Sequence, residues 1–198
     1  DCLLSRGLGD VYKRQVYALV AAIDAKDSFT FQHSTNVSQY AVLLAQKLGL
    51  SRNDIQTVKV AGLLHDIGKI GIPESILKKA GKLTNEEYEI MKSHVEKSIE
   101  MIHYLPNMNY VIPAVVSHHE RYDGKGYPRG IKGEEIPFLG RILAVCDSFD
   151  AMISKRAYKE PLSVEYAMGE LEKNKGTQFD PEVADAFIEL IKEGKVPL

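Results

Sequence analysis

The stretch VAGLLHDIGKIGIP, residues 60–73, places a histidine and an aspartate between an apolar run and a glycine-rich segment. The apolar spacing before the pair predicts a buried helix that begins at a capping-box-like Ser51 and ends near His65 and Asp66. The glycines and Pro73 that follow predict a loop. An imidazole next to a carboxylate is costly to bury unless both are hydrogen-bonded or bind a metal. The pair therefore indicates a functional site at the end of a core helix.

Helical patterns continue on both sides of this stretch. The apolar spacing predicts further helices from Val16 to Ile23, after Ser28 to Leu48, from Thr84 to Ile102, after Asn109 to His119, from Phe138 to Ile153, from Ser163 to Lys173 and from Pro181 onward. The segment 120–137 is rich in glycine and predicts one long loop, which is typical of a functional element. The sequence shows no convincing strand pattern and no repeat. It therefore predicts an all-α fold, a single compact bundle of about seven or eight helices.

Composition narrows the class of partner. The chain has 198 residues, of which 44% are hydrophobic and 26% charged, and this predicts one globular domain and excludes global disorder. The net charge of -2 excludes a bulk positive field for long nucleic acid, so a nucleotide partner should be small. Two cysteines indicate a reducing compartment, and we expect a cytoplasmic protein. No segment is apolar enough to predict a membrane span.

The first fifteen residues, DCLLSRGLGDVYKRQ, differ in character from the rest of the chain. They follow neither a helical nor a strand period, so nothing in them predicts a face that could pack on a core. We expect residues 1–15 to be a non-native or linker segment and residues 16–198 to form the domain.

Further histidines and aspartates fall at positions comparable to the first pair. His118 and His119 end a second apolar helix, and the others lie on the core side of a predicted helix. The full set of candidate ligands is His33, His65, Asp66, His94, His118, His119 and Asp147. A single inward histidine is more often a hydrogen-bonded core residue, whereas two adjacent pairs are hard to explain by packing alone. His103 has no such neighbour and is predicted to be structural or exposed.

The types of ligand indicate which metals would fit. Imidazole and carboxylate groups without cysteine suit iron, manganese, zinc, cobalt or nickel. Six or seven ligands exceed the need of one ion, so the sequence predicts a binuclear site with a bridging carboxylate. Two ions about 3.5–4 Å apart can hold both the attacking and the leaving oxygen in phosphoryl displacement.

Two segments resemble the signatures of the HD-GYP family, bacterial metal-dependent phosphodiesterases within the HD phosphohydrolase superfamily. The segments are GLLHDIGKIGIP at 62–73 and HHERYDGKGYP at 118–128, and the resemblance extends from about Ala18 to Ile191. It implies a helical bundle of the HD type with a long GYP loop. It also implies hydrolysis of the bacterial second messenger cyclic di-GMP to pGpG and further to GMP.

The resemblance also implies roles for individual residues. Asp66 would bridge two divalent transition metal ions, iron or manganese, and Lys69 would contact the scissile phosphate; these two are the candidate catalytic residues. The candidate substrate-binding residues are Lys69, Gly126, Tyr127, Pro128, Arg156 and Lys159. Arg156 and Lys159 could equally be solvated surface charges, and Tyr127 could simply rigidify the loop.

The chain departs from the pattern of the family at three places. Asn36 stands three residues after His33, where an arginine is common, and the segment 155–161 reads KRAYKEP where SDRPY is commoner. Both departures concern contacts with the substrate. Phe29 stands one helical turn before His33, where some relatives have an acidic residue that helps to hold a third metal. Because Phe29 has no donor atom, we expect two metals and not three.

Two other functions stay open at this point. One is hydrolysis of another cyclic dinucleotide, such as cyclic GMP-AMP. The other is a catalytically silent module that binds the nucleotide and signals through a partner, although the intact ligand set argues against it. The resemblance further implies an upstream sensory or receiver domain, and a partner protein that docks on the GYP loop.

Overall fold

The computed structural model describes residues 16, 18–21, 30–155 and 160–197. Its α-helices are α2 (Thr30–Lys47), α3 (Arg52–Leu64), α4 (Glu74–Leu77), α5 (Asn85–Lys92), α6 (His94–His103), α7 (Ile112–Ser117), α8 (Phe138–Ile153), α9 (Val164–Lys173) and α10 (Pro181–Lys192). Three short 3₁₀ helices, η1 (Ile67–Gly71), η2 (Asn109–Val111) and η3 (Gly133–Glu135), connect them. Residues 16 and 18–21 are also helical.

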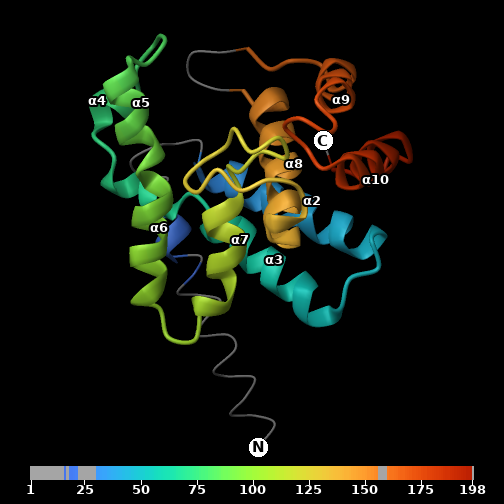
Figure 1. Ribbon diagram of the computed structural model, residues 1–198, viewed down its shortest axis with the longest axis horizontal. Coiled ribbons are helices and arrows are strands. Elements are labelled where there is room, and N and C mark those ends of the chain that lie inside the picture. Colours follow the sequence, from blue (N-terminus) through green and yellow to red (C-terminus); the bar gives the residue numbers. More distant parts are fainter. Residues whose placement is uncertain (1–15, 17, 22–29, 156–159, 198) are drawn as a thin grey trace, which may run out of the picture.

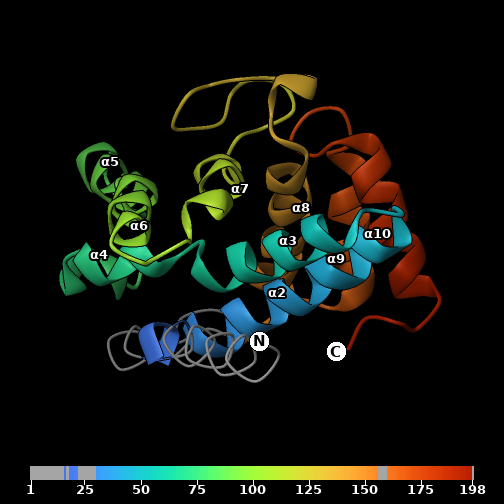
Figure 2. The ribbon, with the colours of Figure 1, turned by 90° about the horizontal axis from the view of Figure 1, so that it is seen from below.

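The helices pack in two layers. Figure 1 shows α6, α7 and α8 running side by side, and Figure 2 shows α2 and α3 crossing beneath this row. The last two helices, α9 and α10, pack against α8 on the side away from α6. No strand occurs in the described ranges, and no helix there is long and apolar enough to cross a membrane. The all-α prediction is confirmed, with nine α-helices in the described ranges where we expected seven or eight.

Local signals in the sequence account for several helix ends. The side chain of Ser51 accepts a hydrogen bond from the amide of Asp54 at the start of α3. Thr84 and Glu87 form the predicted capping box of α5. Gly49 follows α2 with φ of 72°, a left-handed conformation that glycine adopts at little cost. These caps lie within one turn of the helix that they end, which is why the sequence predicts them.

The prediction of a loop at Gly68, Gly71 and Pro73 was wrong in detail. The chain there forms η1 and then α4. Gly68 lets η1 pack closely on α6, because a Cβ atom at this position would lie 2.0 Å from the carbonyl oxygen of His94 and 2.4 Å from the amide of Ser98. The glycine thus permits a close approach between η1 and α6, which lie apart in the sequence.

The single helix predicted from Thr84 to Ile102 was also wrong, because the chain forms α5 and α6 with a break at Ser93. The Ser93 hydroxyl donates to the carbonyl oxygen of Ile90 at 2.6 Å, and such a side-chain bond competes with the helical ladder. The apolar spacing continues across the break, so periodicity alone could not reveal it. The break makes His94 the first residue of α6.

An aromatic cluster joins three of the helices in the core. The rings of Tyr40 on α2, Phe149 on α8 and Phe187 on α10 lie 5.1 to 6.0 Å apart, in edge-to-face or tilted arrangements that are typical of aromatic packing. The Tyr40 hydroxyl donates to the carbonyl oxygen of Pro197 at 3.0 Å. This cluster fixes α2 against α8, the two helices that carry His33 and Asp147.

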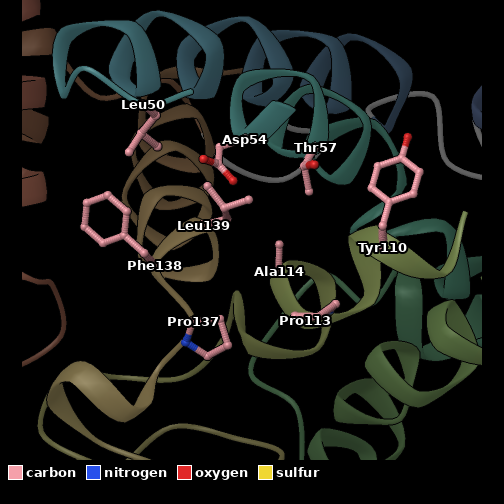
Figure 3. A pocket seen from close by; sticks show the side chains of 9 residues that line it. All are labelled: Leu50, Asp54, Thr57, Tyr110, Pro113, Ala114, Pro137, Phe138 and Leu139. Atoms are coloured by element: carbon pink, nitrogen blue, oxygen red, sulfur yellow. The ribbon is translucent and has the colours of Figure 1, made fainter. Parts of the chain in front are cut away.

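A cavity of about 320 Å³ lies between the N-terminal parts of α3, α7 and α8 (Figure 3). Its lining residues are Leu50, Asp54, Thr57, Tyr110, Pro113, Ala114, Pro137, Phe138 and Leu139. No predicted site residue is among them. Four of the seven predicted ligands follow the C-terminal ends of α3 and α7, and none of the seven lines this cavity, which is therefore separate from the candidate site.

Candidate metal centre

Five helices bring the seven predicted ligands together. His33 lies near the start of α2, Asp147 lies on α8, and His94 begins α6. The remaining ligands are His65 and Asp66, which follow α3, and His118 and His119, which follow α7. Five of the seven side chains are buried, and His119 and Asp147 are partly buried. The structure thus brings the seven side chains into one cluster.

The ligand atoms form two groups that share Asp66. One group is His33, His65 and Asp66, and the other is Asp66, His94, His118 and His119. Within each group the candidate ligand atoms lie within 4.8 Å of one another. Asp66 Oδ2 lies 3.4 Å from His65 Nε2, and Asp66 Oδ1 lies 3.4 Å from His94 Nε2. The two oxygens of one carboxylate thus face different histidines, as a bridging ligand requires.

Asp147 adds a second carboxylate to the first group. Its Oδ1 atom lies 3.1 Å from His33 Nε2 and 3.9 Å from His65 Nε2. The side chain therefore lies between two histidines that belong to different helices.

Hydrogen bonds to the backbone orient three of the histidines. His65 Nδ1 lies 2.8 Å from the carbonyl oxygen of Gly62, His94 Nδ1 lies 2.7 Å from that of Met91, and His118 Nδ1 lies 2.6 Å from that of Val115. Each acceptor precedes its histidine by three residues, which is about one helical turn. An Nδ1–H that donates to a carbonyl leaves Nε2 as the free lone pair, the usual arrangement of a metal-binding histidine.

The buried atoms that face the centre lack hydrogen bonds. Within the described ranges, the Nε2 atoms of His65, His94 and His118 and the Oδ1 atom of Asp66 have no hydrogen-bond partner. Leaving a buried polar atom unpaired costs about 1–3 kcal/mol. Cations held by the two ligand groups would satisfy these atoms, so the donor set fits metal.

Burial and charge keep four of the ligands in the protonation states that bind metal. Burial lowers the pKa of His94, of His118 and of His119, the last to about 3, so these rings are neutral. Burial works to raise the pKa of Asp66, but the charge of Lys69 and the adjacent His65 outweigh it and lower that pKa well below its usual range. Asp66 is therefore a carboxylate.

His33 differs from the other histidines. Burial works to lower its pKa, but the neighbouring carboxylates of Asp147 and Asp150 outweigh burial and raise the pKa to about 9. His33 Nδ1 lies 2.7 Å from Asp150 Oδ2. Asp150 is a residue that the sequence analysis missed. It follows Asp147 by three residues on the same apolar helix, and this spacing is the signal that could have revealed it.

Asp150 is itself held by neighbouring side chains. Asn36 Nδ2 donates to Asp150 Oδ1 at 2.8 Å, and Ser154 Oγ donates to Asp150 Oδ2 at 2.9 Å. Asn36, which stands where the family commonly has an arginine, thus holds Asp150, the hydrogen-bond partner of the candidate ligand His33. The arrangement fixes the ring of His33.

Lys69 lies at the edge of the centre. Its Nζ atom lies 2.5 Å from Asp66 Oδ2, and its side chain is 22% exposed. The 3₁₀ turn of η1 brings the lysine back over the aspartate three residues earlier. A cation that is part-buried beside the shared carboxylate and open to solvent is well placed to meet an anionic substrate.

The GYP loop closes over the other side of the centre. The Tyr127 ring lies 4.8 Å from the His119 ring, and the Tyr127 amide donates to the carbonyl oxygen of His119 at 3.2 Å. Gly126 is required there, because a Cβ atom would lie 2.3 Å from the amide of Arg121. Pro128 is exposed, and the bond before it is cis.

A second residue that the sequence analysis missed holds this loop. The buried carboxylate of Glu120 accepts hydrogen bonds from the amides of Arg129 at 2.7 Å and of Gly130 at 3.1 Å. It ties the far end of the loop to the residue that follows His119. Its place directly after a histidine pair was the available signal.

Three predicted positions cannot be compared with the structure. Arg156, Lys159 and Phe29 lie outside the described residues. His103, which was predicted to be structural or exposed, is exposed, with Nδ1 3.0 Å from Asn109 Oδ1.

A model of the HD domain family matches residues 18–183 of this chain. The chain belongs to the HD domain family. Its resemblance to HD-GYP proteins is confirmed, and so is the expected helical bundle. The match covers every predicted ligand of this HD domain.

Comparison with individual proteins agrees. This HD domain is 44% identical over 170 residues to a cyclic di-GMP phosphodiesterase of Thermotoga maritima, and the aligned region covers 85% of this chain and 46% of that protein. It is also 39% identical over 184 residues to 3′3′-cGAMP-specific phosphodiesterase 2 of Vibrio cholerae, and here the aligned region covers 92% of this chain and 35% of that protein. The chain therefore spans less than half the length of these curated relatives.

Solved structures show the same fold. A cyclic GMP-AMP-specific phosphodiesterase of V. cholerae superposes with a TM-score of 0.73 at 19% identity, over 92% of this chain and 49% of that one. At this level of identity the likeness concerns the fold alone.

Proposed function

We propose that this HD domain is a metal-dependent phosphodiesterase that hydrolyses cyclic di-GMP to pGpG and, in a second round, to GMP. The observation that carries the proposal is the arrangement of two ligand groups around one shared carboxylate, Asp66, with the ammonium of Lys69 beside it. The name of the T. maritima relative supports the choice of substrate.

The proposed centre holds two divalent transition metal ions, iron or manganese. His33, His65, Asp66 and Asp147 would hold one, and Asp66, His94, His118 and His119 would hold the other. When bound, such ions lower the pKa of water and neutralise charge on a phosphoryl group. The support for two ions is the division of the ligands into two groups that share one aspartate.

The side chains of the chain itself supply positioning and charge. The Lys69 ammonium lies at the solvent edge of the ligand cluster, where it would pair with a non-bridging oxygen of the scissile phosphate. Negative charge grows on these oxygens in the transition state, so a fixed cation lowers the barrier. On the other side, Tyr127 and the loop around Gly126 and Pro128 would limit access of bulk water and orient the substrate.

The first experiment is turnover of cyclic di-GMP followed by liquid chromatography, with elemental analysis of the same protein purified without chelator. We expect about two metal ions per chain and formation of pGpG, and we expect a chelator to abolish both. Two bound metals with no turnover of any cyclic dinucleotide would favour a silent nucleotide-binding module and overturn the proposal.

A second candidate substrate is 3′3′-cyclic GMP-AMP. The V. cholerae relative at 39% identity carries that specificity in its name. Parallel assays with both dinucleotides decide between them, since the preferred substrate has the higher kcat/KM.

We also propose that the domain works together with a sensory or receiver domain upstream and that the GYP loop docks a partner protein. The greater length of the curated relatives supports the first point. A change in turnover of the longer protein when its signal is added tests the role of the upstream domain. Co-purification of a partner protein with this domain, and its loss when the GYP loop is altered, tests the docking.

A further inference from the structure

Two tyrosines and a lysine form a cluster beside the metal centre. The Tyr88 and Tyr127 rings lie 6.3 Å apart at an interplanar angle of 80°. Lys92 Nζ lies 5.3 Å from the centroid of the Tyr88 ring and 5.7 Å from that of Tyr127. Tyr88 and Lys92 are four residues apart on α5 and therefore share a face of this helix.

The cluster is continuous with the candidate ligands. Tyr127 connects the two, because its ring also lies 4.8 Å from the His119 ring. Lys92 precedes the ligand His94 by two residues, at the break between α5 and α6. The cluster therefore lies at the rim of the centre on the α5 side, within reach of a ligand that spans two nucleotides.

The exposed part of the cluster has the chemistry of a nucleotide subsite. Tyr88 is 47% exposed, so part of its ring is open to solvent beside the candidate metal centre. The side chain of Lys92 is 25% exposed, and its ammonium pairs with Glu89 Oε1 at 2.6 Å on the open side. Exposed aromatic rings stack nucleobases, and a lysine between them can pair with a phosphate.

We infer that Tyr88 and Lys92 form a subsite for the nucleotide of the substrate that is not being cleaved. Its purine base stacks on Tyr88, and the phosphate beside it replaces Glu89 as the partner of Lys92. The inference rests on the proposed function, because only a dinucleotide can reach the metal centre and α5 together. It assigns α5 a part in selecting dinucleotides over smaller phosphodiesters.

The test compares two substrates. Tyr88→Ala and Lys92→Met should each raise KM for cyclic di-GMP roughly 10- to 100-fold, the range for loss of one base stack or one phosphate contact. Neither should change the hydrolysis of methyl p-nitrophenyl phosphate, which has no purine and one phosphate. Tyr88→Phe keeps the ring and should restore the wild-type KM.

Matched controls come from α9. Tyr166 is 54% exposed, and Lys173 pairs with Glu170 three residues earlier, as Lys92 pairs with Glu89. Tyr166→Ala and Lys173→Met should leave both reactions unchanged. Melting temperatures of all variants verify that each is folded.

Binding gives a second readout that needs no turnover. Titration calorimetry of the metal-loaded chain with a non-hydrolysable phosphorothioate analogue of cyclic di-GMP should show the same 10- to 100-fold increase in Kd for Tyr88→Ala and Lys92→Met. Unchanged Kd and KM in both variants would overturn the subsite. Absence of turnover in the wild type would instead contradict the proposed function, and the binding data would still decide on the subsite.

Discussion

Asp66 is the residue on which both ligand groups depend, since each of its oxygens faces a different histidine. We predict that Asp66→Ala lowers the metal content from two ions to less than one per chain and abolishes hydrolysis. Elemental analysis and turnover measure both effects. Asp185→Ala, at an exposed aspartate of α10, is the control and should keep both. Two bound ions and normal turnover in Asp66→Ala would contradict the shared-carboxylate centre.

We expect Lys69 to contribute to the rate of hydrolysis and not to metal binding. We predict that Lys69→Ala keeps the metal content and lowers kcat by about 10²–10³, the usual loss when a group that stabilises transition-state charge is removed. Lys59→Ala, at an exposed lysine of α3, is the matched control. Unchanged kcat would show that Lys69 is only a solvated partner of Asp66. Loss of metal would show that it supports the ligand cluster structurally.

Asp150 should act through His33. We predict that Asp150→Asn lowers metal affinity about 10- to 100-fold, because the carboxylate that orients a ligand histidine also raises its basicity. A titration against a competing chelator measures the affinity. Asp180→Asn alters another buried carboxylate, one that caps α10, and should lower stability without changing metal affinity. Equal metal affinities of Asp150→Asn and the wild type would contradict this role.

At the scale of the elements, the contact between η1 and α6 is so close that it leaves no room for a side chain at Gly68. A Cβ atom at Gly68 would meet backbone atoms of α6 at 2.0 and 2.4 Å, and backbone cannot move aside as a flexible side chain can. We predict that Gly68→Ala costs about 1–3 kcal/mol in the free energy of unfolding, the usual cost of overpacking. Urea denaturation measures it.

The same substitution should also weaken metal binding. Asp66 and His94 belong to one ligand group, and separation of η1 from α6 would move them apart. Gly81→Ala is the matched control, because a Cβ atom at Gly81 would meet nothing within 4 Å. A Gly68→Ala protein as stable as the Gly81→Ala protein would show that the two elements can separate freely.

Helix caps and helix breaks differ in how far they can be predicted. The caps at Ser51, Thr84 and Asp180 depend on side chains that bond to amides two or three residues away, so a short pattern is sufficient. The break at Ser93 lies within an unbroken apolar period. It is stable because α6 packs on η1 and α7, contacts that no local pattern contains.

At the scale of the whole molecule, the first fifteen residues are expected to contribute nothing. We predict that deletion of residues 1–15 changes neither the melting temperature nor the turnover, because their sequence offers no face that could pack. Differential scanning calorimetry and the cyclic di-GMP assay measure the two quantities. A large drop in melting temperature would show that the segment belongs to the domain.

The sequence by itself determined the all-α class, several helix ends and the set of candidate ligands. Those helix ends follow from bonds within one turn. The histidine and aspartate pairs stand out because such groups are rarely buried after apolar helices unless they are paired or bind a metal. The HD domain family follows from the same motifs. The division of the ligands was not contained in any of these patterns.

Only the tertiary structure decided how those ligands divide around Asp66, that Asp150 and Glu120 support the site, and that Tyr88 and Lys92 stand beside Tyr127. Tyr88 and Tyr127 are separated by two helices and part of a loop, so their contact depends on how α5, α6 and α7 pack. Packing is set by the fit of whole helix faces, whereas a sequence pattern reports only the periodicity of one helix at a time.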